Sequence, residues 1–131
     1  MIRKLKVLSG ISKIVYHRTY LNNLVKILTQ NKFYLSSAES SDAENILCEG
    51  KYYMSTSRTR YSRYQNGNVV LVLDGEKLGQ RYRGKSVDYW SGMASDKLTE
   101  QEDRIWSDKP YIPNAMKYIK RVDIGGLKYA K

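Results

Sequence analysis

Three short segments of the sequence carry side chains that could do chemistry together. They are Tyr16-His17-Arg18-Thr19, Tyr52-Tyr53-Met54-Ser55-Thr56-Ser57-Arg58 and Glu100-Gln101-Glu102-Asp103-Arg104. Taken singly, each has an ordinary explanation: a structural histidine, hydroxyls in a loop, or carboxylates on one solvated strand face. Taken together, they supply an imidazole, several hydroxyls and a carboxylate. A fixed carboxylate beside a sugar can stabilise a positive charge that develops on that sugar.

The order and spacing of the three segments resemble the signature of the ADP-ribosyltransferase superfamily. That signature has a His or Arg on the first strand, a Tyr or Ser-Thr-Ser on the second, and a Glu on a later strand. Tyr-His-x-Thr, followed by a helix over residues 22–30, is similar to the opening of the family's DNA-targeting toxin branch. Gly50-Lys-Tyr-Tyr-Met-Ser, followed by Tyr61 and Tyr64, is similar to its poly-ADP-ribose polymerase branch. A His and a Ser-Thr-Ser usually mark different branches, so the branch stays open.

This resemblance covers about residues 13 to 124 and implies one domain over residues 1–131. The implied fold is α+β, the split β-sandwich of ADP-ribosyltransferases, with an early helix and short peripheral helices. The implied substrate is NAD, bound in a cleft between two small sheets, without a metal ion. The implied reaction transfers ADP-ribose to a macromolecular acceptor, either a protein side chain or a nucleic-acid base. A phage or mobile-element effector that modifies host machinery would have such a compact form.

The resemblance assigns the catalytic roles to the Glu-x-Glu pair. Cleavage of the bond between nicotinamide and ribose develops an oxocarbenium-like cation, as in glycoside hydrolysis. In the family's Glu-x-Glu form the second Glu is catalytic and the first orients the acceptor, which corresponds to Glu102 and Glu100 here. Arg58 would neutralise the diphosphate or stabilise the leaving sugar. A basic residue on an exposed turn is the competing interpretation of Arg58.

The same resemblance places NAD against the first two segments. Adjacent strand residues point to opposite faces, so either His17 or Arg18 lines the site, and Tyr-His-x-Thr favours His17 together with Thr19. Ser55 would hydrogen-bond the ligand or brace Glu102. The remaining expected NAD contacts are the other two hydroxyls of the triplet and the candidate aromatic walls for nicotinamide: Thr56, Ser57, Tyr53, Tyr61 and Tyr64.

Hydrophobic periodicity predicts the elements that must position these residues. Alternation predicts strands over residues 13–19, 33–35, 51–56, 100–106 and 118–124, and one or two short strands within 80–90. The apolar run 69–73 predicts a buried central strand. A helix capped by Asn22 or Asn23 runs to Gln30, with Leu24, Ile27 and Leu28 as its apolar stripe. Helical turns are predicted at 43–47 and 58–64, loops at 36–50 and 92–99, a capped turn at 74–78 and a turn at 114–117.

The distribution of these elements favours an α+β fold. Helix is concentrated early and short strands dominate later, which differs from the regular alternation of a parallel α/β sheet. The sequence also lacks Gly-x-Gly-x-x-Gly and a phosphate-loop lysine after a Gly-rich turn. A parallel nucleotide-binding sheet is therefore not expected.

Two further functions remain open. Lys and Arg number 23 against 13 Asp and Glu, a net charge of +10, which suits either a polyanionic partner or a well-solvated surface. Arginines interleave with tyrosines at Tyr61, Arg63 and Tyr64 and at Arg81, Tyr82 and Arg83, as in a non-enzymatic nucleic-acid-binding module. An enzyme like the NAD-dependent RNA 2′-phosphotransferases, which rely on basic residues instead of a catalytic Glu, is the third possibility.

Cysteine content and hydropathy bear on location. No apolar run approaches the roughly 20 residues of a membrane span, and the stretch at 7–11 is too brief for a signal peptide. Cys48 is the only cysteine, so it cannot form an internal disulfide, and it cannot build a metal cluster with His17 alone. These features predict the reducing cytoplasm, or the host cytoplasm for a phage-encoded chain, without a membrane partner.

Overall fold

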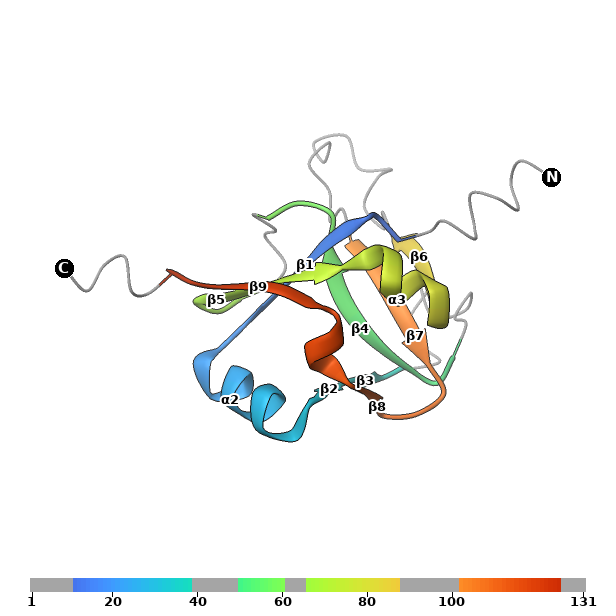
Figure 1. The fold of residues 1–131 in the computed structure, drawn as a ribbon. Coiled ribbons are helices and arrows are strands. Elements are labelled where there is room, and N and C mark those ends of the chain that lie inside the picture. Colours follow the sequence, from blue (N-terminus) through green and yellow to red (C-terminus); the bar gives the residue numbers. More distant parts are fainter. Residues whose placement is uncertain (1–10, 39–49, 61–65, 88–101, 126–131) are drawn as a thin grey trace.

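The structure, a computed structural model, describes residues 11–38, 50–60, 66–87 and 102–125 (Figure 1). Glu100, Tyr61 and Tyr64 lie outside these ranges, as do Arg63, Cys48, the predicted turn at 43–47 and the predicted loop at 92–99. The described elements are β1 (Ile14–Thr19), α2 (Leu21–Gln30), β2 (Lys32–Tyr34), β3 (Ser36–Ser37), β4 (Tyr52–Ser57), β5 (Val69–Asp74), α3 (Gly75–Arg81), β6 (Arg83–Val87), β7 (Glu102–Ser107), β8 (Tyr111–Pro113), the 3₁₀ helix η2 (Ala115–Lys117) and β9 (Ile119–Ile124).

The fold is mixed α+β and mostly antiparallel sheet. Within the described ranges, the main sheet has the strand order β6-β7-β4-β1-β5-β9, with β3 beside β4, and β2 pairs with β8 in a separate two-stranded sheet. All of the pairings described between these strands are antiparallel. The α+β class expected from the sequence is therefore confirmed.

The main sheet is weakly joined at one position, between β1 and β4. Six residues of β1 pair with β5, and six residues of β4 pair with β7. Between β1 and β4, in contrast, only Tyr16 and Ser57 are in register. Figure 1 shows that β1, β5 and β9 run in a clearly different direction from β4, β7 and β6. The sheet thus consists of two strand groups that meet at a single pair and then diverge.

One face of the main sheet carries the hydrophobic core. Alternation along the strands places Val15, Leu71, Met54 and Ile105 on this face. Both helices, η2 and the β2–β8 sheet contribute the residues that complete the core: Leu24, Ile27, Phe33, Leu78, Ile112 and Ala115. The opposite face carries a row of aligned cross-strand residues, Tyr16, Ser57 and Glu102. Ser55 and Glu102 lie on this second face, whereas alternation along β1 places His17 on the same side as Val15.

Helix α2 begins earlier than the sequence predicted. Its N-cap is Tyr20, not Asn22 or Asn23, and it ends as expected at Asn31, which has a left-handed backbone (φ 55°). Leu24 and Ile27 are buried, but Leu28 is 41% exposed, so the predicted apolar stripe is wrong at that position. No helix in the described ranges has the length and apolar character needed to cross a membrane.

Three other segments differ from the predicted elements. Part of the expected loop at 36–50 forms β3, because its backbone pairs with β4. The expected capped turn at 74–78 extends into α3, whose cap Asp74 accepts a hydrogen bond from the Lys77 N–H at 3.0 Å. Residues 58–60 form a bend in place of a helical turn, and the Thr59 N–H donates to the Ser57 hydroxyl there. The buried strand predicted at 69–73 is confirmed as β5.

Candidate functional site

Ser55 and Glu102 are brought together by the register of β4 and β7. Ser57 lies opposite Glu102, and Ser55 lies opposite Arg104, so all four side chains share one face of the sheet. The Ser55 hydroxyl donates a hydrogen bond of 2.6 Å to Oε2 of Glu102. Glu102 is only 8% exposed. The structure thus places the predicted catalytic carboxylate on the predicted serine and fixes its orientation.

Arg104 is a second partner of this carboxylate. Its Nε donates to the same oxygen, Oε2 of Glu102, at 3.0 Å, and Arg104 is also 8% exposed. The guanidinium lies over the Tyr53 ring, 4.3 Å from its centre, a geometry that favours a cation. Both donors contact one oxygen, and none of the described residues donates a hydrogen bond to Oε1 of Glu102. The carboxylate is therefore held through Oε2 by two side chains.

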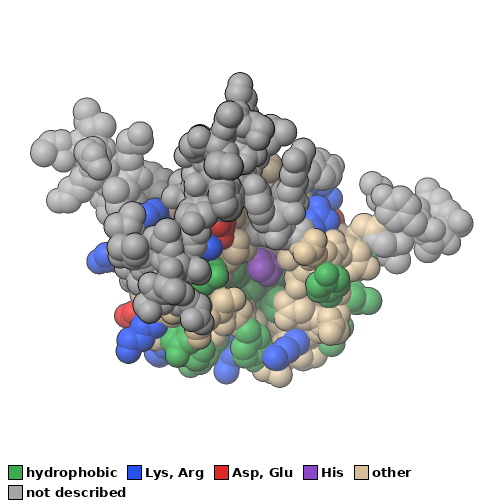
Figure 2. Space-filling model, turned by 180° about the vertical axis from the view of Figure 1, so that it is seen from behind, with side chains coloured by type: hydrophobic (Ala, Val, Ile, Leu, Met, Phe, Trp, Pro, Cys, Tyr) green, Lys and Arg blue, Asp and Glu red, His purple; other side chains and the backbone are tan. Residues whose placement is uncertain are grey.

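His17 contacts the main chain of the same serine. Its Nδ1 lies 2.8 Å from the Ser55 carbonyl oxygen, and because a carbonyl can only accept, Nδ1 carries the proton. Burial lowers the pKa of His17 below 6.5, and the hydrogen bond to Ser55 offsets this only in part. The ring is therefore neutral at pH 7, and its Nε2 is a hydrogen-bond acceptor. His17, the only histidine in the chain, is half-buried, and its side chain is visible between its neighbours in the view of Figure 2.

The contact between His17 and Ser55 lies where β1 leaves β4. Continuing the register of Tyr16 and Ser57 would place Arg18 opposite Ser55. The strands diverge instead, and the imidazole of His17 bonds the Ser55 carbonyl at that position. Covalent geometry keeps the carbonyl oxygen and hydroxyl oxygen of one serine within roughly 5 Å of each other. Imidazole, hydroxyl and carboxylate are therefore grouped within the length of a dinucleotide.

Arg18 and Thr19 have structural partners. The Arg18 guanidinium donates to the carbonyl oxygens of Gly67, at 3.1 Å, and Arg60, at 3.2 Å. The Thr19 hydroxyl accepts a 2.7 Å hydrogen bond from the amide of Asn23, in the first turn of α2, and Thr19 is 7% exposed. Of the two candidates for contact with the NAD ribose, His17 therefore contacts Ser55, whereas Arg18 binds the backbone of neighbouring segments.

The other two hydroxyls of the triplet are buried and hydrogen-bonded within the fold. Thr56 is fully buried, and its hydroxyl donates to the Asp103 carbonyl oxygen at 2.6 Å. The Ser57 hydroxyl accepts from the Thr59 N–H at 3.1 Å where β4 ends. Of the three, Ser55 is the one that the structure places on Glu102.

Arg58 pairs with a buried carboxylate that the sequence reasoning gave no role. Its Nε lies 3.5 Å from Oδ1 of Asp103, whose side chain is fully buried and whose Oδ2 accepts from the Ser12 N–H at 3.1 Å. A buried carboxylate is costly unless it is paired. Alternation along the strand could have indicated this burial. It places Asp103 on the core face of the sheet and Glu102 on the opposite face. Arg58 thus compensates a charge within the fold.

Tyr53 and Arg104 differ most from their sequence-based expectations. The Tyr53 ring packs on Arg104 and, with ring centres 5.2 Å apart, on Trp106. Arg104 was named only as part of the third segment and had no assigned role. The signal that could have identified it is its spacing of two residues from Glu102 on one strand. Glu100, Tyr61 and Tyr64 lie outside the described residues.

The described part of the chain contains no group of three or more His, Cys, Asp or Glu side chains placed to hold a metal ion. Comparisons of the chain with protein-family models, with curated proteins and with solved structures find no match.

Proposed function

We propose that the chain is an NAD-dependent ADP-ribosyltransferase with the split β-sandwich fold. The observation that carries the proposal is the double role of Ser55, which accepts from His17 at its carbonyl and donates to Glu102 from its hydroxyl. The divergence of β1 from β4 beyond the Tyr16–Ser57 pair supports a split of the sheet next to Ser55. NAD would lie at this split.

Glu102 has the chemistry that the glycosidic step needs. The bond between C1′ of the ribose and the nicotinamide nitrogen breaks, its electron pair leaves with nicotinamide, and positive charge develops on the ribose. A carboxylate held by Ser55 and Arg104 requires little reorganisation to stabilise that charge. Its Oε1 is the oxygen that would accept from a ribose hydroxyl. A nucleophile of the acceptor then bonds to C1′ and releases its proton to water.

His17 is suited to orient the ribose. With Nδ1 committed to the Ser55 carbonyl, its Nε2 accepts a hydrogen bond from a sugar hydroxyl. Burial, which lowers the pKa of His17, preserves this acceptor at neutral pH. His17 and Glu102 would then hold the ribose between two acceptors while nicotinamide departs.

The direct test is transfer of label from NAD. The full chain is incubated with NAD labelled in its ADP-ribose part, together with cell extract, DNA or RNA, and is compared with Glu102→Gln. We expect label on a protein or a nucleic acid, released nicotinamide, and a loss of roughly a hundredfold or more in the variant, the scale for removing one electrostatic stabiliser of a transition state. Absence of nicotinamide release with every acceptor would contradict the proposal.

The matched control is Glu76→Gln. Glu76 is an exposed glutamate in the first turn of α3, and its substitution also removes one carboxylate. We expect it to transfer label at the rate of the unaltered chain. A 2′-phosphotransferase reaction, which would rely on basic residues, predicts instead that Glu102→Gln keeps its activity and that a 2′-phosphorylated RNA is consumed. The pair of glutamate variants therefore separates the two NAD-dependent reactions.

A further inference from the structure

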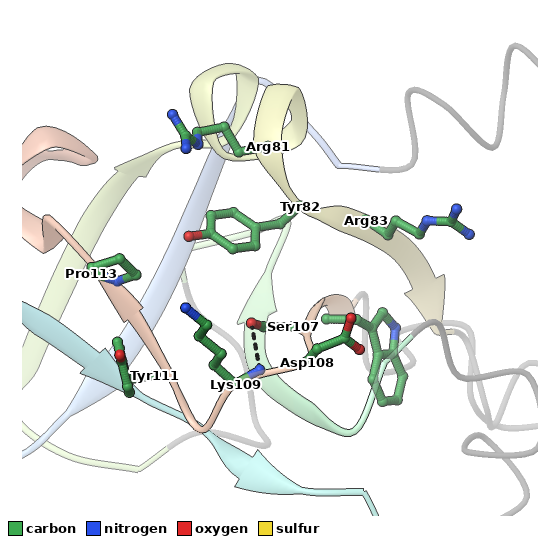
Figure 3. Close-up of a pocket in the computed structure, with 9 residues that line it drawn as sticks. Arg81, Tyr82, Arg83, Ser107, Asp108, Lys109, Tyr111 and Pro113 are labelled. Carbon is green, nitrogen blue, oxygen red and sulfur yellow. Dashed lines mark hydrogen bonds between the residues drawn. The ribbon is translucent and has the colours of Figure 1, made fainter.

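A cavity of about 480 Å³ lies where β7 turns into β8, with the junction of α3 and β6 on its other side (Figure 3). We call this cavity the β7–β8 pocket. The residues that give it its charge and its aromatic surface are Arg81, Tyr82, Arg83, Trp106, Lys109 and Tyr111. Its volume is within the range of cavities that hold compact organic ligands, including nucleotides.

The lining of the β7–β8 pocket is positively charged. Arg81, Arg83 and Lys109 are cationic, and Asp108 is the one acid among its lining residues. The net charge of the whole chain has the same sign, at +10. Such a cavity attracts phosphate groups and raises their local concentration.

The Tyr82 ring stands beside Lys109, whereas the Arg81 and Arg83 side chains extend away from the ring. In Figure 3 the Tyr82 ring projects from the α3–β6 junction over the cavity, and the Lys109 side chain extends from the β7–β8 turn toward it. Tyr82 meets Tyr118 edge to face, with ring centres 6.4 Å apart, and this contact restrains its orientation. The Lys32 ammonium, which is outside the lining, lies 4.5 Å from the ring centre of Tyr111. An aromatic ring thus stands beside a cation in the pocket.

Trp106 lines the same pocket, and its indole N–H is buried in the wall behind it. It is 3% exposed, and its indole N–H is buried with no acceptor among the described residues. A buried donor without an acceptor is unfavourable by about 1 to 3 kcal/mol.

We propose that the β7–β8 pocket binds one nucleotide of a single-stranded nucleic acid, with the base against Tyr82 and a phosphate at Lys109, while Arg81 and Arg83 add positive charge at the rim. Stacking on an aromatic ring beside cations is how proteins hold single strands without reading their sequence. A base inside a duplex cannot reach a ring within a cavity. An acidic peptide would satisfy the cations but would leave the tyrosine face without a flat partner.

Nucleotide binding in the β7–β8 pocket does not require NAD chemistry at Glu102. Glu102 lies four residues before Trp106 on β7, about 13 Å along the strand. Substitution of Glu102 should therefore leave nucleic-acid binding unchanged, whereas substitution in the pocket should change it. The two proposals can fail separately.

The test measures fluorescence anisotropy of labelled eight-nucleotide oligo-dT and oligo-U with the full chain. A duplex of the same length and an eight-residue glutamate peptide serve as the competing ligands. We expect both single strands to bind more tightly than either competitor. Tyr82→Leu should weaken single-strand binding by roughly fivefold or more, the lower end for loss of one base–aromatic stack, and Tyr82→Phe should retain it.

Lys109→Gln and Lys120→Gln form a charge-matched pair. Both lysines are exposed, and Lys120 lies on β9, at the opposite edge of the sheet from β6. Lys109→Gln should weaken binding and lower the slope of log affinity against log salt by about one, while Lys120→Gln should not. Equal effects of the two variants, or duplex or peptide binding as tight as single-strand binding, would overturn the inference. Melting temperatures verify folding, and Lys109→Gln decides the outcome if Tyr82→Leu does not fold.

Discussion

Ser55 binds His17 through its main chain and Glu102 through its side chain. The carbonyl oxygen lies 2.8 Å from Nδ1 of the imidazole, and the hydroxyl lies 2.6 Å from Oε2 of the carboxylate. One residue of β4 thereby sets the position of two groups that come from β1 and β7. Because the two contacts use different atoms of Ser55, a side-chain substitution can remove one and leave the other.

Ser55→Ala should reduce NAD turnover far more than it reduces stability. The variant removes the hydrogen bond to the Glu102 carboxylate and keeps the carbonyl that His17 contacts. We expect the free energy of unfolding to fall by about 1.5 to 3 kcal/mol, the scale for a hydrogen bond to a charged group. We expect kcat for nicotinamide release to fall at least about tenfold, because the carboxylate is less well oriented.

Urea unfolding and nicotinamide release measure the two effects. Ser37→Ala is the matched control, because Ser37 is exposed on β3, which pairs with the same strand β4. A Ser55→Ala variant with unaltered kcat would show that its hydroxyl does not orient a catalytic group.

Arg104→Met should destabilise the protein by about 3 kcal/mol. Both side chains of the Arg104–Glu102 pair are 10% exposed, so removing the cation leaves a carboxylate that is nearly buried and uncompensated. Arg104→Lys should recover little, since an ammonium does not reproduce the planar stacking on Tyr53.

A double-mutant cycle with Glu102→Leu measures the coupling of this pair by urea unfolding. Once the carboxylate is absent, replacement of Arg104 by Met should cost much less than it does in the unaltered chain. Additive effects of the two substitutions would mean that the ion pair contributes nothing to stability.

Periodicity predicted the positions of the strands better than their partners. The apolar run at 69–73 and the alternation at 13–19 depend on burial of one or both strand faces, and both are strands in the structure. The start of α2 could not be placed, because two asparagines offered local caps while the actual cap is Tyr20. Segment β3 was missed because two serines carry no pattern and form a strand only by pairing with β4.

The candidate site was predictable in its residues but not in its connections. Family resemblance pointed to His17, Ser55 and Glu102, and the structure connects all three. The resemblance could not show that Arg104 and Ser55 contact the same oxygen of Glu102, because this contact depends on how β7 lies against β4. Nor could it show that Arg58 compensates Asp103, since the burial of that carboxylate is set by residues far apart in the chain.

Gly67→Ala should destabilise the fold beside the site, while Gly79→Ala should not. Gly67 has a φ of +125°, and a Cβ there would lie 2.0 Å from the Thr19 carbonyl oxygen. We expect the free energy of unfolding to fall by at least about 2 kcal/mol, because the substitution strains the backbone and displaces β1. At Gly79, in α3, a Cβ would lie at an ordinary contact distance of 3.7 Å from Ile11. Alanine there should raise the free energy of unfolding by about 0.4 to 1 kcal/mol. Thermal and urea unfolding compare the two, and equal effects would contradict the close approach at Gly67.

His17 should make stability and NAD turnover depend on pH below 6.5. Burial lowers the pKa of His17 in the folded protein below 6.5, its value in the unfolded chain. The unfolded chain therefore binds more protons in this window, so the contribution of the neutral ring is complete above pH 6.5. It is lost as the pH falls from 6.5 toward the folded pKa.

Unfolding in urea between pH 8 and pH 5 should show the stability difference between the unaltered chain and His17→Asn shrinking below pH 6.5. The acid Asp123 does not interfere, because its pKa is lowered from 3.8 and it titrates below this window. Nicotinamide release should fall over the same range, since protonation of Nε2 removes the acceptor for a ribose hydroxyl. A stability difference that stays constant from pH 8 to pH 5 would mean that the imidazole is not held neutral by its surroundings, and its assignment as the acceptor would then fail.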